Sequence, residues 1–575
     1  MNQVKKNYYQ YIPYLLFTIC TIALLLKTRY SFCWSDETFY ASTTHRFYQG
    51  DSIFYHEWFP TQLVSLLLLP LHSLFVIITG STTGILLFFR ICYVFFSLAV
   101  SLTAFHILKK TYSVFISLCC ALFYFFYAHL NIATLSYYTM SVGFYLLAML
   151  LIYDSINSID YKKRKLIASG VFFAASVICL PSMALAYFIC SAALILCSIK
   201  KKELRSIFPY TLIGIVSLAV IILIYVFSKI SIKDILETLP FVLSDEEHAT
   251  SLIYPFKKFF ISIHQVYGKA TYISYLFILF TFIFGRRLNP VYKQLLTIGN
   301  ILLFFIYFYF SIGHTGYIST AMTLFALPCY FMTVKRNQPL LFLLYGSGLI
   351  FSMVFSYSSN GYLYIMTLGH SISAIGSICF ISDFMQEILD ASSSYTLTTQ
   401  KLFCTLFALI IGITLIQTMT LRMVNIYRDA PLSQLTRKIT IGPAAGLYTT
   451  ERHQSDYQTV YETIQTYCTN DEGTIFFTKL LPWGYLATDM KCAAPTTWRT
   501  KFSSERLPVY YQEHPEKFPN IIFVLDEKIG SYDACGDVEA DPTPNENEVG
   551  GWLLEYVTEN NYEIIRTDCG MIYRK

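Results

Sequence analysis

The sequence predicts a polytopic α-helical membrane protein with about thirteen transmembrane helices and a C-terminal α/β domain outside the membrane. Of the 575 residues, 55% are hydrophobic, 17% aromatic and 14% charged, and the mean hydropathy is +0.48. Soluble domains carry about 25% charged residues. The hydrophobic residues fall in blocks of roughly 17–25, the length of helix that crosses a bilayer core of about 30 Å. The net charge of +5 comes from short basic clusters between these blocks, so it gives no support to nucleic-acid binding.

The basic clusters predict the topology of the spans. The first block runs into Thr28-Arg29 without a small-residue cleavage site, which predicts a signal-anchor helix. Short loops rich in Lys and Arg stay in the cytoplasm, and one arrangement places every cluster inside, with the N-terminus inside and the C-terminus outside. Its thirteen helices are approximately 11–27, 84–108, 111–129, 131–153, 165–180, 182–199, 207–228, 271–285, 291–312, 316–334, 339–356, 361–382 and 403–423.

Two apolar segments need separate treatment. Segment 61–79 is long enough to span, but counting it would place Lys109-Lys110 outside. We therefore predict an interfacial or re-entrant helix there, opened by Pro60 and kinked at Pro70. The run 165–199 is short for two spans, and Pro181 near its middle marks the predicted hairpin.

The character of the chain changes after about residue 425. We divide it into a transmembrane domain, 1–425, and an extracytoplasmic α/β domain, 426–575, which holds most of the acids and no hydrophobic span. Strand-like runs are Gly473–Lys479, Asn520–Leu525, Tyr562–Thr567 and Met571–Arg574, and a helix is expected over Tyr457–Cys468. Four cysteines of this domain could form two disulfides in three connectivities, or stay free. They are Cys468, Cys492, Cys535 and Cys569.

The first outer loop, residues 28–60, is the strongest candidate for an active site. It contains Trp34-Ser35-Asp36-Glu37-Thr38-Phe39-Tyr40, then Gly50-Asp51, then Tyr55-His56-Glu57-Trp58-Phe59-Pro60. Ionisable groups beside a membrane cost free energy unless something uses or pairs them.

A carboxylate in this position can take the proton of an acceptor hydroxyl that attacks a sugar. Such a displacement also needs cations or a metal to stabilise the leaving group. Asp36 and Glu37 are adjacent, so their side chains diverge, and one is expected to act as base while the other binds or supports. The alternative is a set of solvated acids that cap a helix at Thr38.

The order and spacing of these residues resemble the first outer loop of GT-C glycosyltransferases. The closest likeness is to the group of the lipid A aminoarabinose transferase and the protein O-mannosyltransferases. It covers about residues 30–95 and is architectural beyond them. The resemblance implies a lipid-phosphate sugar donor and inversion at the anomeric centre. The acceptor would be a hydroxyl of a lipid, glycan or protein on the outer face.

Carried over residue by residue, the resemblance matches Asp36 to the catalytic acidic residue of the family. It matches Glu37 to the neighbouring residue, which lies near the donor or the acceptor. Glu57 falls on a glutamate that helps to hold a metal, so a divalent ion is a possible cofactor. Arg90 stands where such proteins often carry an arginine. The family typically reads Glu-Lys-Pro-Pro, whereas this chain reads Glu57-Trp58-Phe59-Pro60, so a cation expected near the donor phosphate is missing.

A lipid phosphate still needs a positive partner. Arg90 is one candidate, and the outer loop 229–270 offers others, although Lys257-Lys258 could equally make simple headgroup contacts. His56, His248 and His264 could complete a metal site with Glu57 or be polar surface. His370 is expected to pack between helices. The full set of substrate-binding candidates is Tyr40, Asp51, His56, Glu57, Arg90, Lys257, Lys258, His264, Lys269 and His314.

Three other kinds of protein fit parts of the sequence. A transporter or lipid-linked glycan flippase would carry charges or broken helices at mid-membrane, often in repeated halves, whereas here the acids cluster at the predicted outer surface and no halves repeat. An oligosaccharide polymerase or ligase would carry a large late loop, whereas loops 313–315 and 357–361 are short. A non-catalytic scaffold is the third. We therefore predict an inverting glycosyltransferase of the cell membrane, and the lack of Asn-x-Ser/Thr sequons in 426–575 is typical of a bacterial source.

Overall fold

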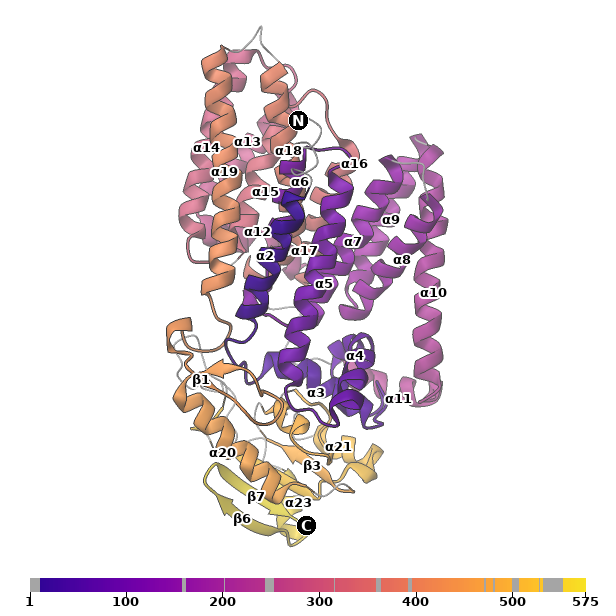
Figure 1. Cartoon of the computed structure of the whole chain (residues 1–575). Helices are drawn as coiled ribbons and strands as arrows, with labels where there is room; N and C mark the ends of the chain where they lie inside the picture. The colour runs from indigo at the N-terminus through magenta and orange to yellow at the C-terminus, as the bar shows by residue number, and fades with distance from the viewer. Residues whose placement is uncertain are drawn as a thin grey trace.

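The structure is a computed structural model of the 575-residue chain. It describes residues 11–157, 162–200, 202–243, 253–314, 316–357, 363–390, 396–469, 472–478, 481–498, 506–526, 528–530 and 552–575. A bundle of long helices stands on a smaller domain that contains a β-sheet and the C-terminus (Figure 1). The predicted fold class is confirmed.

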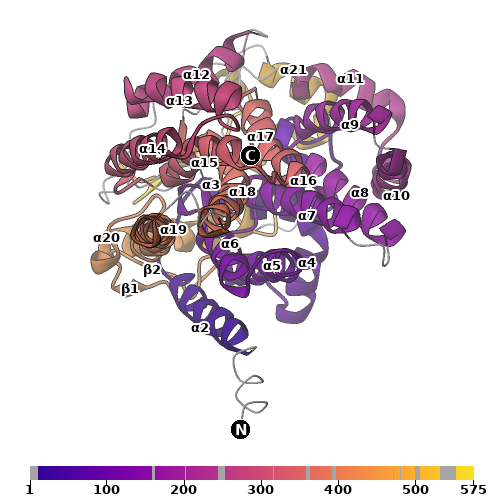
Figure 2. The ribbon, with the colours of Figure 1, turned by 90° about the horizontal axis from the view of Figure 1, so that it is seen from above.

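Every segment that the sequence predicts to span the membrane is helical. Seen from above, α18 lies near the centre of the bundle and α2 at its edge (Figure 2). The helices are α2 (Ile12–Lys27), α5 (Ile85–Leu108), α6 (Val114–Phe126), α7 (Tyr137–Asn157), α8 (Lys162–Cys179), α9 (Met183–Lys200), α10 (Ile207–Phe227), α13 (Ala270–Phe284), α14 (Pro290–Ser311), α15 (Tyr317–Met332), α16 (Gln338–Leu340) with α17 (Ser347–Phe355), α18 (Leu363–Asp390) and α19 (Leu397–Val424).

The number of membrane crossings is less definite than the number of helices. Among the described residues, eight helices are long and apolar enough to cross a membrane, or nine if the pair Phe256–Tyr267 and Ala270–Phe284, bent by 117°, is one span. Four further apolar helices have 10–17 residues. The chain is thus a multi-pass membrane protein, and the count of thirteen spans stays a prediction.

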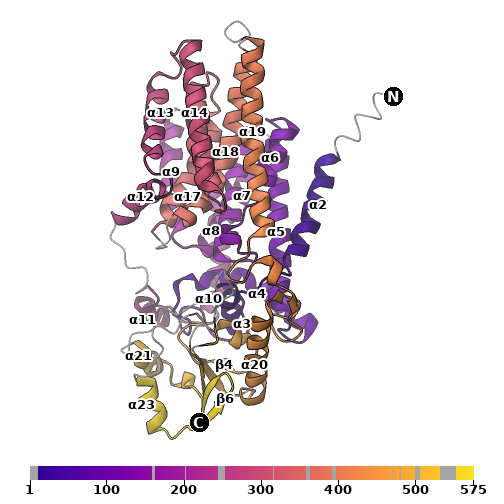
Figure 3. The same ribbon diagram turned by 90° about the vertical axis from the view of Figure 1, so that its left-hand side faces the viewer.

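The segment predicted to be interfacial is one of those eight. It forms η1 (Pro60–Leu63) and α4 (Val64–Thr79), with Pro70 inside α4 and Gly80, at φ +72°, ending it. It lies beside α3 (Asp36–Tyr48) at the end of the bundle next to the C-terminal domain (Figures 1 and 3). His45 Nδ1 of α3 is 3.3 Å from His72 Nε2 of α4. This position favours an interfacial helix, although length and composition also allow a span.

Two of the basic clusters lie together at the end of the bundle opposite the C-terminal domain. Lys110 and Lys165, which flank different helices, both pair with Asp154 of α7, at 2.6 and 2.8 Å. These two clusters therefore share one side, as the predicted topology requires.

The two long outer loops predicted from the sequence contain helices. Residues 28–60 contain α3, and 229–270 contain α11 (Ile232–Leu243) and α12 (Tyr254–Tyr267). The Ser/Thr-rich sequence of α3 is too polar to read as a buried helix, yet eleven of its residues are buried. Packing between the bundle and the C-terminal domain overrides the weak local signal.

The C-terminal domain has a five-stranded sheet of order β4-β3-β5-β7-β6. The strands β3 (Thr474–Phe477), β4 (Lys491–Cys492) and β5 (Ile521–Leu525) are parallel, whereas β7 (Gly570–Arg574) is antiparallel to β5 and to β6 (Glu563–Thr567). A short hairpin pairs β1 (Arg437–Lys438) with β2 (Tyr448–Thr449), and the helices are α20 (Glu451–Tyr467), α21 (Arg506–Glu513) and α23 (Trp552–Glu559). The predicted strands and helix are confirmed.

The cysteines of this domain form no disulfide within the described part of the chain. Cys468, Cys492 and Cys569 are free and buried, and Cys535 lies outside the described residues.

The C-terminal domain and the first outer segment share one hydrophobic core. Trp34 packs edge-on against Trp483, with ring centroids 5.1 Å apart, and Trp58 against Tyr510 at 4.9 Å. These four aromatic rings are buried. The shared core holds α3 between the bundle and the sheet domain.

Candidate active site

Asp36 is the first residue of α3 and has one carboxylate oxygen held and the other open. Oδ2 accepts a hydrogen bond from the Tyr427 hydroxyl and forms an ion pair with Arg428 Nε at 3.0 Å. Oδ1 has no hydrogen-bond partner among the residues that the structure describes. The side chain is 19% exposed. The carboxylate is therefore fixed in orientation and still able to accept a proton.

The segment that fixes Asp36 follows α19 directly, and the sequence reading assigned it no role. Arg428 Nη1 also donates to Ser35 Oγ at 3.2 Å. The next residue, Asp429, accepts from the backbone N–H of Phe32 at 2.8 Å. The three consecutive polar residues Tyr427-Arg428-Asp429 thus bind both sides of the turn that opens α3. Their position after the last hydrophobic block was the one available signal.

Glu37 forms a buried ion pair with Arg90 of α5. Arg90 Nε and Nη2 each donate to one oxygen of the carboxylate. Arg90 Nη1 also donates to the carbonyls of Thr28, Tyr30 and Ser31, at 2.8–3.1 Å. Both Arg90 and Glu37 are buried. The pair ties α3 and the end of α2 to α5, so in this structure Glu37 and Arg90 bind each other.

Arg46 of α3 is the centre of a second buried charge cluster. It donates to Asp51 at 2.6 Å, to Glu57 at 3.0 Å and to Tyr510 of α21 at 3.0 Å. Lys517 of the C-terminal domain pairs with Asp51 at 2.5 Å. Burial raises the pKa of Asp51, but the Arg46 and Lys517 cations outweigh it and lower that pKa to about 2. Asp51 and Glu57 thus join the outer segment to the C-terminal domain.

Glu57 is already paired with a cation in this structure. It is fully buried, its Oε2 accepts from Arg46 and, at 3.4 Å, from the Thr497 N–H, and burial raises its pKa. The Arg46 guanidinium thus takes the place of an ion at Oε2, whereas Oε1 is buried without a hydrogen-bond partner among the described residues. His248, suggested as a further ligand, lies outside the described residues.

A different group of donor atoms lies nearby, within 4.8 Å of one another: His56, His514 and Glu516. His56 Nδ1 accepts the Ser52 N–H at 2.8 Å, so the neutral ring carries its proton on Nε2. That nitrogen faces Glu516 at 3.4 Å, and a protonated nitrogen cannot bind a metal. His56 therefore could bind a metal through Nε2 only by giving up its hydrogen bond with Ser52, and no metal enters the chemistry proposed below.

Two further cations lie buried at the same end of the bundle. Lys27, the last residue of α2, has a buried Nζ without a hydrogen-bond partner. Arg422, in the last turn of α19, is 4% exposed. Its Nη1 donates to the Asn131 carbonyl at 3.4 Å, and its Nε has no partner. Arg90 and Arg422 are close enough to repel the Lys27 ammonium group. The sequence reading missed both residues because they lie inside predicted spans.

The remaining predicted residues lie apart from Asp36. Lys257, Lys258 and His264 belong to α12, which packs against α13, α17 and α18. Lys258 is buried, Lys257 is exposed, and His264 Nδ1 is 3.0 Å from the Gly268 carbonyl. The structure thus does not join this helix to α3.

The structure also places four other residues that the sequence analysis singled out. Lys269 is exposed at the start of α13, and His314 is exposed and stacks on Tyr317 at 4.9 Å. His370 is buried between helices, as expected, with Nδ1 2.7 Å from Thr320 Oγ1. Tyr40 is buried against Tyr137, with ring centroids 5.6 Å apart.

Comparison with known proteins gives structural neighbours only. No protein-family model and no curated protein matches the chain. The oligosaccharyltransferase of Archaeoglobus fulgidus, tethered with an acceptor peptide, is 11% identical with a TM-score of 0.45, covering 90% of this chain and 69% of that one. ArnT from Cupriavidus metallidurans is 9% identical in the apo state, with a TM-score of 0.40 and 97% of both chains covered. Its complex with undecaprenyl phosphate has a TM-score of 0.41, with 98% and 97% covered.

These neighbours are membrane glycosyltransferases of the GT-C superfamily. At such low identities and TM-scores they carry no inference about chemistry. The functional assignment rests on the residues of this chain.

Proposed function

We propose that this chain is an inverting membrane glycosyltransferase. It moves a sugar from a polyprenyl-phosphate donor to an acceptor hydroxyl on the extracytoplasmic face. The observation that carries the proposal is Asp36, which is held through Oδ2 by Tyr427 and Arg428 and open at Oδ1. A general base must be fixed in orientation and must keep an acceptor oxygen available.

In the proposed step, Asp36 Oδ1 takes the proton of the acceptor hydroxyl. The acceptor oxygen forms a bond to the anomeric carbon as the bond from that carbon to the phosphate oxygen breaks. Polyprenyl phosphate leaves with the electron pair of the broken bond. Arg428 pairs with Oδ2 of Asp36 and so orients the carboxylate, and the Glu37–Arg90 pair holds the first turn of α3 in place.

Lys27 and Arg422 are the proposed partners of the donor phosphate. Negative charge builds on the phosphate as the glycosidic bond breaks, and fixed cations stabilise it best in a water-poor site. Both side chains lack a charged partner among the described residues, and both stand at helix ends on the side of Asp36. They take the role of the lysine missing after Glu57.

The decisive experiment is Asp36→Asn. The change keeps size and hydrogen bonding but removes the proton acceptor, so transfer should fall by about 10² or more. The assay is transfer from a panel of short-chain polyprenyl-phosphate sugars by purified protein. Asp489→Asn, at an exposed site in the C-terminal domain, is the matched control. Near-normal turnover by Asp36→Asn would remove Asp36 from the mechanism.

The phosphate site is tested separately. Lys27→Gln and Arg422→Gln should raise the KM for donor and slow the chemical step, because each removes one charge from the leaving group's surroundings. Arg29→Gln, two residues beyond Lys27 and exposed, is the control. Donor kinetics equal to those of the control would exclude the pair as the phosphate site.

The orientation in the membrane belongs to the proposal. Because two of the basic clusters lie at the end opposite the C-terminal domain, that domain should be extracytoplasmic. A cysteine at Arg437, exposed in β1, should then react with an impermeant thiol reagent on intact cells, and one at Arg287 should not. The reverse pattern would contradict the topology.

A further inference from the structure

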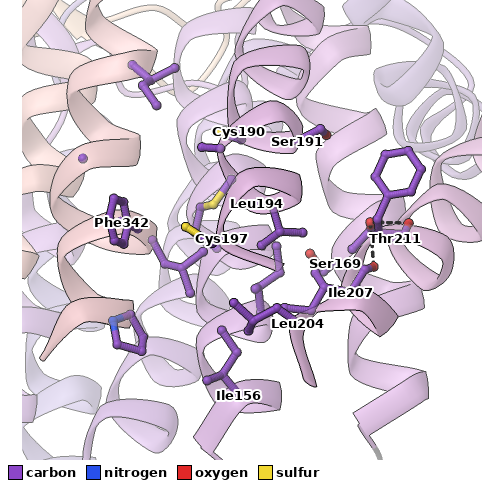
Figure 4. Close-up of a pocket in the computed structure, with 18 of the residues that line it drawn as sticks. Ile156, Ser169, Cys190, Ser191, Leu194, Cys197, Leu204, Ile207, Thr211 and Phe342 are labelled. Carbon is purple, nitrogen blue, oxygen red and sulfur yellow. Dashed lines mark hydrogen bonds between the residues drawn. The ribbon is translucent and has the colours of Figure 1, made fainter. Parts of the chain in front are cut away.

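A second site lies in the bundle, toward the end away from Asp36. It is a cavity of about 500 Å³ between α7, α8, α9, α10 and the start of α17. Figure 4 shows Ile156, Leu194, Leu204, Ile207 and Phe342 around it. Its walls are mostly aliphatic and aromatic side chains. Water has few polar partners in such a space, so an apolar occupant is favoured over water.

The cavity is partly open to the surface of the bundle. Three of the residues that line it, Ala193 of α9, Gln338 of α16 and Phe342, are exposed. In a membrane-spanning bundle this opening faces the lipid. An acyl chain can therefore enter the cavity from the bilayer.

The wall of the cavity contains an irregular turn. Residues Leu341–Gly346 form a π-helical turn between α16 and α17, and Leu341, Phe342, Leu343 and Gly346 all line the cavity. Such turns are rare and occur mostly at functional sites. The irregularity thus coincides with the opening, independently of the apolar composition.

Two exposed cations neighbour the lining of the cavity, and we call them its basic rim. Arg205 is exposed and follows Leu204, which lines the wall. Lys163 is exposed, and its Nζ lies 5.6 Å from the ring centre of Tyr210, in the same turn of α10 as Phe208 and Thr211 of the lining. Basic pockets between transmembrane helices on the cytoplasmic side suit anionic lipid headgroups.

We propose that the cavity binds one acyl chain of an anionic phospholipid, with the headgroup on Arg205 and Lys163. The site is distinct from the glycosyl-transfer site and does not depend on that assignment. The complementarity between the basic rim and an anionic headgroup, above an apolar cavity open to the bilayer, selects this occupant.

The test uses the placement of the native tryptophans. All five, Trp34, Trp58, Trp483, Trp498 and Trp552, lie in the first outer segment or the C-terminal domain. A Phe342→Trp variant therefore reports from the cavity alone once the signal of the unmodified protein is subtracted. Leu196→Trp, on the exposed face of α9 and outside the lining, is the matched control for bulk lipid. Each protein is reconstituted in phosphatidylcholine with increasing fractions of phosphatidylglycerol that carries brominated chains, which quench tryptophan.

Quenching of Phe342→Trp should saturate at a low fraction of brominated phosphatidylglycerol, while quenching of Leu196→Trp rises in proportion to it. Arg205→Gln should raise the half-saturation fraction about fivefold, the effect of one basic residue near an anionic surface. Arg287→Gln, an exposed arginine at the same end, should not.

Four results would overturn the proposal. They are the same quenching curve at both tryptophan positions, equal saturation with brominated phosphatidylcholine, an Arg287→Gln effect as large as that of Arg205→Gln, and displacement of the brominated lipid by polyprenyl phosphate but not by unlabelled phosphatidylglycerol. Size-exclusion profiles of the variants confirm folding. These readouts involve no glycosyl transfer, so their failure and that of the proposed function are distinguishable.

Discussion

Replacing Arg46 by Met should strongly destabilise the junction between α3 and the C-terminal domain. Arg46 is 1% exposed and donates to Asp51, Glu57, the His56 carbonyl and Tyr510 at 2.6–3.0 Å. Met fills most of its volume but supplies none of these hydrogen bonds. Asp51 keeps Lys517 as a partner, whereas Glu57 is left as a fully buried carboxylate without a cation. Breaking a buried ion pair from one side costs about 3–5 kcal/mol.

Protonation of Glu57 limits this cost. Burial raises its pKa even in the presence of Arg46, so the Arg46→Met variant can neutralise the carboxylate, and its deficit should shrink as the pH is lowered toward 5. The double variant Arg46→Met/Glu57→Gln should recover about 1–3 kcal/mol relative to the sum of the two single changes. Thermal unfolding in detergent, followed by tryptophan fluorescence, measures this because Trp58 and Trp483 lie in the shared core.

The control is Arg437→Met. Arg437 pairs with Glu451 at 2.8 Å, but both side chains are more than half exposed, and such pairs contribute about 0–1 kcal/mol. If Arg46→Met lowers stability no more than Arg437→Met does, the account of Arg46 as the central ion of the junction is wrong.

Three further outcomes follow from the site. Glu37→Gln should cost about 3–5 kcal/mol of stability, because Arg90 would remain buried without a charged partner; thermal unfolding of purified protein measures it, and an unchanged midpoint would contradict the pairing. Tyr427→Phe removes one hydrogen bond to a charged group, worth about 1.5–3 kcal/mol, so kcat/KM should fall roughly tenfold to a hundredfold with expression unchanged; wild-type kinetics would show that Tyr427 does not position the base. Burial lowers the pKa of His56 to about 3 and of His514 to about 4, so between pH 6.5 and 4 the unfolded chain binds more protons than the folded one. Lowering the pH through this range should therefore reduce stability, by up to about 1.4 kcal/mol per histidine and pH unit. The melting temperature of His514→Gln should depend less steeply on pH than that of the unmodified protein, and an identical slope would refute this.

The sequence was sufficient for the helices because their signal is local. Apolar blocks and basic clusters indicate where the predicted spans lie, and Pro60 and Gly80 mark the ends of the helix that we predict to be interfacial. The shape of the first outer segment was not predictable in this way. Asp36–Tyr48 has the composition of an exposed loop and is helical because two larger bodies enclose it.

The identity of the candidate base followed from the sequence, whereas its partners did not. Asp36 was found from charge beside a membrane block. Tyr427 and Arg428 bind it from the far end of the chain, and no pattern within one segment reveals such a pairing. Asp51 shows the same limit, because Lys517 lies 466 residues away.

The long sequence separation between Asp36 and its partners Tyr427 and Arg428 has a consequence for biosynthesis. Asp36 leaves the ribosome soon after the first helix, but Tyr427 follows 391 residues later. At translation rates of about 5–20 residues per second, the carboxylate waits roughly 20–80 s for the side chain that orients it. In a nascent chain with most of its helices already inserted, the Asp36 carboxylate therefore still lacks its Tyr427 and Arg428 partners. Under the proposed function, catalysis therefore requires the last helix and the residues after it, and a product truncated before Tyr427 is expected to be inactive.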